Sequence, residues 1–258
     1  MKLATWNVNS IRARLDRLIA WLAEARPDVV CLQETKVEDA RFPYDALTAA
    51  GYHAVHAGLK TCNGVAILSR VPATDVARGL GDGELDLGDI EQQRLIAATI
   101  DGVRILSVYV PNGGEPGSPQ IAFKMRWLSR LLSHLQKHHR PTDPLVLCGD
   151  FNVAPEARDV DRPDEWKDSV LFNEEARAAL SRLMGFGLID VYRRHVPDAG
   201  KYSWWDYRQL SFPKNNGLRI DHFLATQPVA DRSRSALIDR EMRKGKDASD
   251  HAPVVIEL

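Results

Sequence analysis

Acidic, amide and imidazole side chains border the short apolar runs of this sequence. Before the last run, PVVIEL, stand Asp250 and His251. An acid beside an imidazole can hold a metal or move a proton, although polar residues before a strand are also ordinary loop residues. The same placement recurs at other apolar runs, beside which stand Asn7, Glu34, Tyr109 with Asn112, Asp150 with Asn152, and Asp221. Strand ends hold side chains rigidly and leave one side open, so this recurrence predicts a site built from strand ends.

Two of these residues, Glu34 and Asp250, offer the hard carboxylate oxygens that Mg²⁺ prefers. Asn7 adds a neutral neighbour, which suits an ion that keeps several of its waters. No cluster of Cys and His surrounds these positions in the sequence, so zinc is not expected. The residues therefore predict a Mg²⁺ site in which Mn²⁺ can substitute.

Asp150 and Asn152 lie two residues apart in GDFN, where the apolar run PLVLCG ends. Residues two apart on an extended segment point to the same face. An acid and an amide placed in this way can act on one water molecule, because the acid can accept its proton while the amide keeps it in line. The pair predicts general-base catalysis on water.

Between these residues, apolar runs alternate with helical patterns. The periodicity predicts helices over about residues 11–25, 120–138 and 174–185. Apolar runs between residues 65 and 110 are joined by turns too short for a crossover helix, so antiparallel pairing is mixed in. The number of strands favours two sheets, and no linker or repeat divides the sequence. We expect one α/β domain over residues 1–258, or α+β in stricter usage.

Composition and charge fit an ordinary soluble domain. Of 258 residues, 44% are hydrophobic and 27% are charged, and the net charge is −1. Residues 201–247 carry ten Lys and Arg against six acids, a basic bias that permits a side facing nucleic acid. The cysteines are odd in number and widely spaced, which suits buried thiols in a reducing compartment: Cys31, Cys62 and Cys148. Without a leader or a run of membrane-spanning length, we expect a cytoplasmic monomer with no membrane partner.

Two further patterns are not expected to bind metal. His134 and His138 are four residues apart, like a pair of ligands on a helix, but they close that helix before Pro141, where polar residues need no metal. The acidic stretch over residues 81–91 lacks the pattern of a calcium loop, so we expect a solvated loop there.

Eight motifs resemble, in order and spacing, those of the bacterial exonuclease III family, the abasic-site endonuclease branch of the endonuclease/exonuclease/phosphatase superfamily. They are TWNVNSIRARL, LQETKV, NGVAILSR, SVYVPNGG, GDFNVAP, YSWWDYR, GLRIDHFLA and SDHAPV. The resemblance covers essentially the whole chain and implies a four-layer α/β-sandwich with two central mixed β-sheets flanked by helices. One departure is Ser10, which follows Asn9 where the family usually has Gly, and it puts the geometry of that turn in doubt.

The resemblance also implies how the residues share the hydrolysis of a phosphodiester, which needs a base, a cation on the phosphate and stabilisation of the leaving oxyanion. Asp150 matches the family's base or proton shuttle, and Asn152 its orienter. Asp221 matches the carboxylate that orients His251 toward the scissile phosphate, and such a partner raises the pKa of the imidazole. Tyr109 would donate to the phosphate or, as phenolate, help to organise it.

Metal and DNA contacts follow from the same resemblance. Some family members are described with a second ion, and that question stays open here; its ligands would be Asp150, Asn152 and His251. The expected DNA-binding residues are Asn112, Trp204 and Arg219. Trp204 matches the residue that packs against the extruded abasic sugar, whereas Trp205, on the opposite side of the strand, should lie in the core.

Together these observations predict a metal-dependent DNA-repair phosphodiesterase that acts on double-stranded DNA. We expect incision 5′ to abasic sites, leaving a 3′-hydroxyl, and removal of nucleotides or blocking groups from damaged 3′ ends. The balance between these activities stays open, because it depends on the shape of residues 162–172 and of the basic C-terminal quarter. The alternatives are a superfamily phosphatase for inositol phosphates or sphingolipids, which should differ at YSWWDYR and GLRID, and an inactive binding module, which should lack a site residue.

Overall fold

Two six-stranded sheets form the centre of the protein. The computed structural model describes residues 1–86 and 90–258. The first sheet has the order β11-β12-β1-β2-β4-β3. Its strands are β1 (Lys2–Asn7), β2 (Val29–Gln33), β3 (His53–Ala57), β4 (Val65–Ser69), β11 (Ser235–Ile238) and β12 (Val254–Glu257). The last strand along the chain, β12, is therefore inserted between β11 and the first strand, β1.

The second sheet has the order β5-β6-β7-β8-β10-β9. Its strands are β5 (Thr74–Arg78), β6 (Leu95–Ile100), β7 (Val103–Tyr109), β8 (Leu145–Asp150), β9 (Leu188–Asp190) and β10 (Asp221–Thr226). In each sheet one pair is parallel, β1 with β2 and β7 with β8, and the other pairs are antiparallel. Both sheets are thus mixed, as the sequence predicts.

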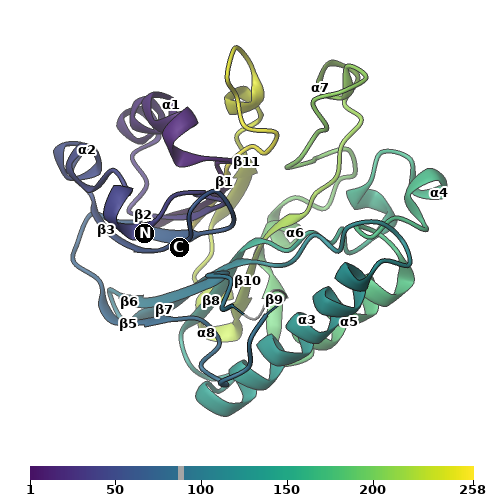
Figure 1. The fold of residues 1–258 in the computed structure, drawn as a ribbon, viewed down its shortest axis with the longest axis horizontal. Coiled ribbons are helices and arrows are strands. Elements are labelled where there is room, and N and C mark those ends of the chain that lie inside the picture. Colours follow the sequence, from purple (N-terminus) through teal and green to yellow (C-terminus); the bar gives the residue numbers. More distant parts are fainter. Residues whose placement is uncertain (87–89) are drawn as a thin grey trace.

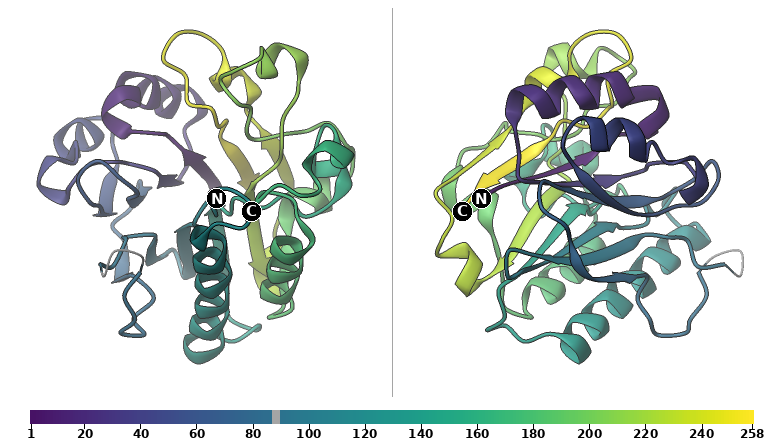
Figure 2. Two further views of the ribbon diagram at one scale, coloured as in Figure 1. Left: turned by 45° about the vertical axis from the view of Figure 1, so that its right-hand side comes forward. Right: turned by 90° about the vertical axis from the view of Figure 1, so that its left-hand side faces the viewer.

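Helices cover the outer faces of the two sheets (Figure 1). The first sheet carries α1 (Ile11–Ala25) and α2 (Tyr44–Ala49), and the second carries α3 (Pro119–His138) and α5 (Glu174–Met184). Figure 2 shows the resulting order of helices, sheet, sheet and helices. The shorter elements are η1 (Asp39–Arg41), η2 (Ala157–Asp159), α4 (Pro163–Trp166), α6 (Val191–His195), α7 (Ser211–Lys214), α8 (Gln227–Ala230) and η3 (Arg240–Arg243). The four-layer α/β-sandwich that the sequence resemblance implies is confirmed.

Strands at the centre of this sandwich are apolar on both faces because helices lie on one side and the other sheet on the other. In β1, Leu3 packs in the layer between the sheets, whereas Ala4 and Trp6 pack beneath α1. Val146 and Cys148 of β8 enter the same inner layer from the second sheet. Burial on both faces gives a strand continuous hydrophobic runs instead of alternation, which is the pattern in the sequence.

The helix boundaries follow local signals. Residues 11–25 form α1 over the range predicted. The predicted start of α3 moves to Pro119, the first helical position, where proline's fixed φ fits and its missing N–H is not needed. At α5 the side chain of Asn173 accepts a hydrogen bond from the N–H of Ala176 at 2.8 Å, and the helix ends one residue before Gly185.

Two expectations about loops are corrected. The acidic stretch 81–91 is not simply solvated, because Arg130 of α3 lies 2.7 Å from both Asp82 and Asp86. Asp86 is buried in this contact, while the part of the prediction that concerns residues 87–89 lies outside the described residues. Cys31 and Cys148 are buried as expected, but Cys62 is exposed, since it belongs to the connection between β3 and β4 and not to a strand.

The long helices α1, α3 and α5 are amphipathic, and the other described helices are short. Among the described residues, none of the helices is long and apolar enough to cross a membrane.

Candidate active site

Three residues of the second sheet stand side by side at one of its ends. Tyr109 ends β7, Asp150 ends β8 and Asp221 begins β10. The register pairs Tyr109 with Asp150 and Asp150 with Asp221. The end of β8 meets the start of β10 because the two strands are antiparallel. Residues 112 positions apart in sequence, Tyr109 and Asp221, are thereby fixed to the same edge.

At the facing end of the first sheet, Asn7 ends β1 and Glu34 follows β2. The Nδ2 atom of Asn7 donates to Glu34 Oε1 at 2.8 Å and to Asp150 Oδ2 at 2.9 Å. The main-chain N–H of Asn9 donates to Asn7 Oδ1 at 2.9 Å, which fixes the orientation of the amide. Asn7 therefore joins carboxylates of both sheets through its nitrogen. Its Oδ1 is turned toward the main chain of Asn9, and its predicted role at the metal site stays a prediction.

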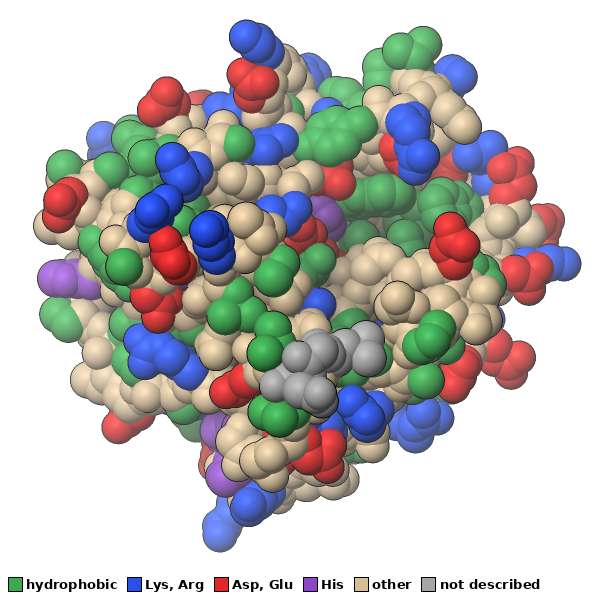
Figure 3. Space-filling view, viewed as in Figure 1, with side chains coloured by type: hydrophobic (Ala, Val, Ile, Leu, Met, Phe, Trp, Pro, Cys, Tyr) green, Lys and Arg blue, Asp and Glu red, His purple; other side chains and the backbone are tan. Residues whose placement is uncertain are grey.

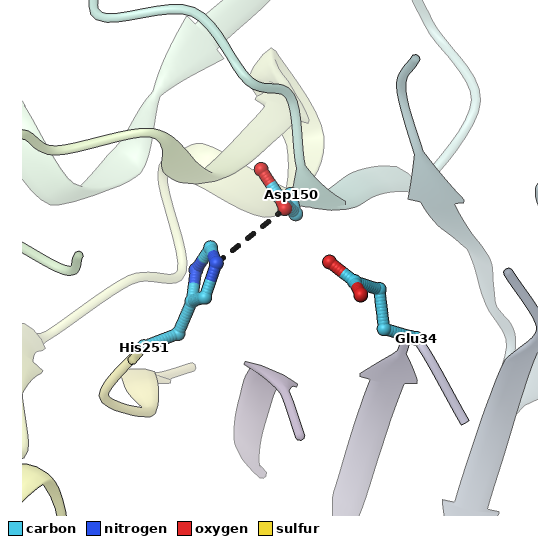
Figure 4. A group of neighbouring side chains, drawn as sticks. All are labelled: Glu34, Asp150 and His251. Carbon is cyan, nitrogen blue, oxygen red and sulfur yellow. Dashed lines mark ion pairs between the residues drawn. The ribbon is translucent and has the colours of Figure 1, made fainter. Parts of the chain in front are cut away.

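Glu34, Asp150 and His251 point toward one another from three separate segments (Figure 4). One potential ligand atom of each residue lies within 4.8 Å of those of the other two. Two of the three are carboxylates, which are the hard donors that Mg²⁺ and similar cations prefer. The two carboxylates of the group can therefore hold a divalent cation, and they fit the ion class that the sequence predicts.

Asp250 lies outside this group of three. Its Oδ1 accepts a hydrogen bond from Asn9 Nδ2 at 2.9 Å, and its Oδ2 accepts one from Trp204 Nε1 at 3.0 Å. Burial disfavours its charge, but His251 and these hydrogen bonds outweigh burial and hold the pKa of Asp250 below its ordinary value. In this structure the oxygens of Asp250 face Asn9 and Trp204, and its role as a metal ligand together with Glu34 stays a prediction.

His251 is held between two carboxylates. Its Nδ1 lies 2.9 Å from Asp221 Oδ2 and its Nε2 lies 3.7 Å from Asp150 Oδ2. Burial disfavours the imidazolium, but the charges of Asp221 and Asp150 outweigh burial and raise the pKa of His251 to about 10. The structure brings Asp221 and His251 together as the sequence predicts, and the imidazole is cationic at neutral pH.

Asp150 experiences the opposite balance. It is 1% exposed, and burial raises the pKa of its carboxyl, with further contributions from Asp221 and Glu34. His251 and the hydrogen bond from Asn7 act in the other direction but do not cancel the shift. A raised pKa makes Asp150 a stronger base than an ordinary aspartate, which is the property that a proton acceptor for water needs.

Asn152 is fixed by hydrogen bonds on every side. Its main-chain N–H donates to Asp150 Oδ1 at 2.9 Å, and its Nδ2 donates to the carbonyl oxygen of Val110 at 3.0 Å. Its Oδ1 accepts a hydrogen bond from Asn112 Nδ2 at 3.0 Å. Asn112 is exposed, so this pair of amides leads from the buried carboxylates to the surface. Asn152 lies beside Asp150, but not on the extended segment that the sequence predicts, because β8 ends at Asp150 and the φ of Asn152 is 51°.

Tyr109 is a neutral phenol in this environment. Burial raises the pKa of its hydroxyl well above the ordinary value, and the charges of Glu34 and Asp150 raise it further. The guanidinium of Arg94 lies 4.8 Å from the centre of the Tyr109 ring and opposes this shift without reversing it. Of the two expectations for Tyr109, the structure favours a hydrogen-bond donor over a phenolate.

The two neighbouring tryptophans point in different directions. Trp205 is fully buried, as predicted, and packs edge-on against Phe212 at 5.2 Å between ring centres. Trp204 is half-buried beside Asp250 and meets Trp166 edge-on at 6.2 Å. Figure 3 shows a hollow on this face, with hydrophobic side chains along its wall and acidic and histidine side chains at one end. An aromatic surface therefore adjoins the carboxylates.

Arg219 does not reach this surface. Its side chain is 0% exposed, with Nε 2.6 Å from Asp159 Oδ1 and an Nη 2.7 Å from Asp190 Oδ2. Another Nη donates to Nδ1 of His222 at 2.9 Å. The predicted contact of Arg219 with DNA is corrected, because its donors are used inside the protein.

Sequence reasoning missed three cations near the site. Lys36 lies 2.7 Å from Glu34 Oε2 and donates to Asn9 Oδ1, and its place in LQETK could have drawn attention to it. Arg94 and Lys124 had no such signal, since one precedes a strand and the other lies in the middle of a helix. Only the fold brings them to the site.

The model of the endonuclease/exonuclease/phosphatase family matches residues 4–251, and the chain belongs to this family. Within it, the chain is similar over 100% of both lengths to exodeoxyribonuclease III of Haemophilus influenzae, with 35% identity. An AP endonuclease structure from Archaeoglobus fulgidus has a TM-score of 0.94 and 41% identity, over 100% of this chain and 99% of that one. A 3′ phosphatase from Neisseria, bound to a product DNA hairpin, has a TM-score of 0.94 and 39% identity with the same coverage.

Proposed function

We propose that the protein is a DNA-repair phosphodiesterase that incises duplex DNA 5′ to abasic sites and removes nucleotides, phosphates or other blocking groups from 3′ ends. Full-length similarity to an exodeoxyribonuclease III, an AP endonuclease and a 3′ phosphatase supports this proposal. The observation that carries it is the convergence of Glu34, Asp150 and His251 where both sheets end.

The proposed cofactor is Mg²⁺, with Mn²⁺ as a substitute. Glu34 is its main ligand, supported by the facing carboxylate of Asp150. When bound, the ion supplies positive charge to a phosphate oxygen and so stabilises the charge that develops there. Lys36 lies 2.7 Å from Glu34 Oε2 and balances its charge from the opposite side.

In the proposed reaction, Asp150 accepts the proton of the attacking water. Its raised pKa favours proton acceptance. The N–H of Asn152 donates to Oδ1 of Asp150, and the other oxygen, Oδ2, is the one that faces Glu34 and His251. Asn152 and Asn112 form the polar wall along which the water is aligned. Removing such a base costs about 10²–10⁴ in rate.

His251 and Tyr109 are the proposed donors to the phosphate. His251 is cationic and oriented by Asp221, so its Nε2–H can donate to an anionic oxygen. Tyr109 stays protonated and can donate from the neighbouring strand. Both donors strengthen as negative charge grows on the phosphate, which lowers the barrier more than it tightens substrate binding.

The proposed partner is double-stranded DNA with abasic sites or damaged 3′ ends, bound by a cytoplasmic monomer. Trp204 supplies an aromatic surface next to Asp250 for an extruded sugar. Asn112 is exposed beside Asn152 and is the second proposed DNA contact.

The proposal is tested with two labelled duplexes, one containing a single abasic site and one ending in a 3′-phosphate. We expect incision of the first to a 3′-hydroxyl and a 5′-deoxyribose phosphate, and release of phosphate from the second, in Mg²⁺ but not in EDTA. An undamaged duplex of the same sequence measures exonuclease activity. Absence of all three activities, with hydrolysis of an inositol phosphate or a sphingolipid instead, would overturn the proposal.

The metal assignment is tested separately with Glu34→Gln, which keeps the side chain's size and removes its charge. We expect the Mg²⁺ concentration for half-maximal cleavage to rise at least about tenfold, with partial recovery at high Mg²⁺, since each hard anionic ligand contributes strongly to such sites. Glu38→Gln, at a half-buried acid four residues along the chain that pairs with Arg41, is the matched control. Unchanged Mg²⁺ dependence of Glu34→Gln would remove Glu34 from the metal site.

A further inference from the structure

A fully buried lysine lies behind the site. Lys124 belongs to α3, and its side chain is 0% exposed. Its Nζ donates to three main-chain carbonyl oxygens, those of Asn112 at 3.1 Å, Asn152 at 2.7 Å and Val170 at 2.6 Å. None of these carbonyls belongs to a described strand or helix. A single ammonium group therefore joins three loops.

The burial of this ammonium group opposes folding unless hydrogen bonds compensate for its lost hydration. Burying an ammonium ion costs several kcal/mol even after the protein relaxes. Burial lowers the pKa of Lys124 to about 7, but three carbonyl acceptors require three N–H donors, and only the ammonium form provides them. The neighbours of Lys124 one turn along the helix, Trp127 and Leu128, are apolar. An apolar residue at position 124 would match them but would leave the three carbonyl oxygens without this donor.

The three loops are the ones that form one side of the site. The Asn112 loop follows β7, the Asn152 loop follows β8, and Val170 lies beyond α4. Lys124 donates to the carbonyl oxygen of Asn152. The N–H of Asn152 in turn donates to Asp150, and its side-chain oxygen accepts a hydrogen bond from Asn112. Asn152 also has a φ of 51°, a left-handed conformation that asparagine adopts more readily than most residues, and the contacts of its N–H, carbonyl and side chain hold it there.

The stem of Lys124 is closely packed as well. A Cβ at Gly113 would lie 3.1 Å from Lys124 Cδ and 3.3 Å from Val170 Cβ. The lysine, the Asn112 loop and the Val170 loop therefore leave little room for one another to move. A shift of the ammonium group would be passed to the main chain of Asn112 and Asn152.

We propose that Lys124 is a positioning residue for hydrolysis, which holds the Asn112–Asn152 amide pair in register with Asp150 without touching the substrate. This inference rests on the proposed function, in which the two amides align the attacking water. A misplacement of about 1 Å at such a position can cost about 10²-fold in rate. Lys124 thus acts on the chemical step through Asn152.

The decisive variant is Lys124→Met, with Lys137→Met at the exposed end of the same helix as the matched control. In single-turnover cleavage of the abasic duplex, we expect Lys124→Met to lower the rate about 10–100-fold. Binding of the same duplex in Ca²⁺ should change less than about threefold, and Lys137→Met should change neither value. Should Lys124→Met not fold, Lys124→Arg replaces it, because Arg keeps the charge but cannot place one nitrogen on all three carbonyls.

A double-mutant cycle with Asn152→Ala separates positioning from a general loss of structure. If Lys124 acts through Asn152, Lys124→Met should lower the cleavage rate less than about threefold in the Asn152→Ala background, because the effects of residues that act as a unit are not additive. The same 10–100-fold loss in both backgrounds would overturn the proposal. So would a folded Lys124 variant that cleaves at the wild-type rate.

A measurement without substrate keeps this inference distinct from the proposed function. Hydrogen exchange of the amides around Asn112, Asn152 and Val170 should accelerate together in Lys124→Met and stay unchanged in Lys137→Met. If the wild-type protein cleaves no DNA, the proposed function fails, and this coupled exchange still decides whether Lys124 holds the three loops. Unchanged exchange in all three loops would overturn the inference whatever the activity.

Discussion

Two buried clusters of charged residues within the described part of the chain are built in opposite ways. In the internal cluster, Asp159 and Asp190 bind Arg219, and Arg193 also binds Asp159. Two acids thus face two guanidinium groups, and the cluster is closed. In the site cluster, three carboxylates face one imidazolium: Glu34, Asp150, Asp221 and His251. Lys36 adds a second positive charge at the rim.

The site cluster is left incomplete in two further respects. Asp221 Oδ1 is buried and has no hydrogen-bond partner among the described residues. Several residues of the site loops have positive φ, a conformation that costs about 1–3 kcal/mol each in non-glycine residues: Asn9, Ser10, Glu34, Lys36 and Asn152. The described residues of the internal cluster have none. A cluster with balanced charges and no backbone strain stabilises the fold. A cluster with excess negative charge on strained loops is suited to binding a cation and to catalysis.

The largest expected effect separates the clusters by activity. Asp150→Asn keeps the size of the side chain and removes the proton acceptor, so single-turnover cleavage of an abasic duplex should slow by about 10²–10⁴. Binding in Ca²⁺ or EDTA should survive. In the same assay, Asp221→Asn combined with His251→Asn should cost much less than the product of the single effects, since the two residues form one hydrogen-bonded unit. Near wild-type cleavage by Asp150→Asn would show that the base is another group.

The second effect concerns stability. Arg219→Met removes the ion-pair partner of Asp190 and leaves Asp159 with Arg193 alone, so the free energy of unfolding should fall by about 3–5 kcal/mol. Arg162→Met is the matched control, because Arg162 pairs with Asp161 and Glu165 at the surface, where such ion pairs contribute little to stability. Urea unfolding measures both. If Arg219→Met instead folds with unchanged stability and binds DNA much more weakly, Arg219 contacts DNA, and the conclusion drawn from its burial is wrong.

A third prediction uses pH, to which the two clusters should respond with opposite signs. Burial opposes the charge of Asp159, but Arg219 and Arg193 outweigh it and lower its pKa, so its stabilisation exists above about pH 4 and is lost as the pH falls further. Burial raises the pKa of Asp150 to about 7, so the folded state prefers its proton and loses stability as the pH rises from about 4 to 7.

This difference is measured by thermal unfolding in EDTA. The melting temperature of Asp150→Asn should rise relative to wild type between about pH 4 and 7, because the variant has no proton to lose. The deficit of Arg219→Met should stay constant over this range and shrink only in stronger acid. A melting-temperature difference for Asp150→Asn that does not depend on pH would contradict the raised pKa.

The smallest effect tests backbone strain beside the site. Ser10 has φ 85° and ψ 105°, a region that glycine occupies far more readily, and its N–H donates to the carbonyl oxygen of Glu34 at 2.7 Å. Ser10→Gly should stabilise the protein by about 1 kcal/mol, or about 2–4 °C in melting temperature. Ser118→Gly, which precedes α3 with an ordinary extended φ of −77°, should not stabilise. Equal effects of the two substitutions would argue against strain at Ser10.

Much of the fold could be predicted because its signals are local. The boundaries of α1 follow from apolar periodicity, and polar residues at strand ends predict that the strands meet at a site. The pairing of Asp221 with His251 follows from the family resemblance and is present in the structure. These features depend on residue type and short-range order, which a sequence displays directly.

The remaining features depend on contacts that no local pattern encodes. Arg219 stands two residues before Asp221, so the sequence suggests a site residue, but its partners Asp159 and Asp190 come from η2 and β9. Lys124 has an unremarkable place in an amphipathic helix, and only the loops around it explain its burial. The orientation of Asn7 depends on a hydrogen bond from Asn9, which is decided by a turn with unusual φ values.

The insertion of β12 between β11 and β1 also sets a time at which the site can form. β1 pairs with β12 through residues such as Leu3 and Ile256, so a strand near residue 255 completes the sheet that β1 begins. His251 lies three residues before β12 and reaches Asp150 only once this strand is docked. A chain still emerging from the ribosome therefore holds Glu34 and Asp150 but no imidazolium between them. Catalytic competence should therefore appear only after β12 has paired with β1.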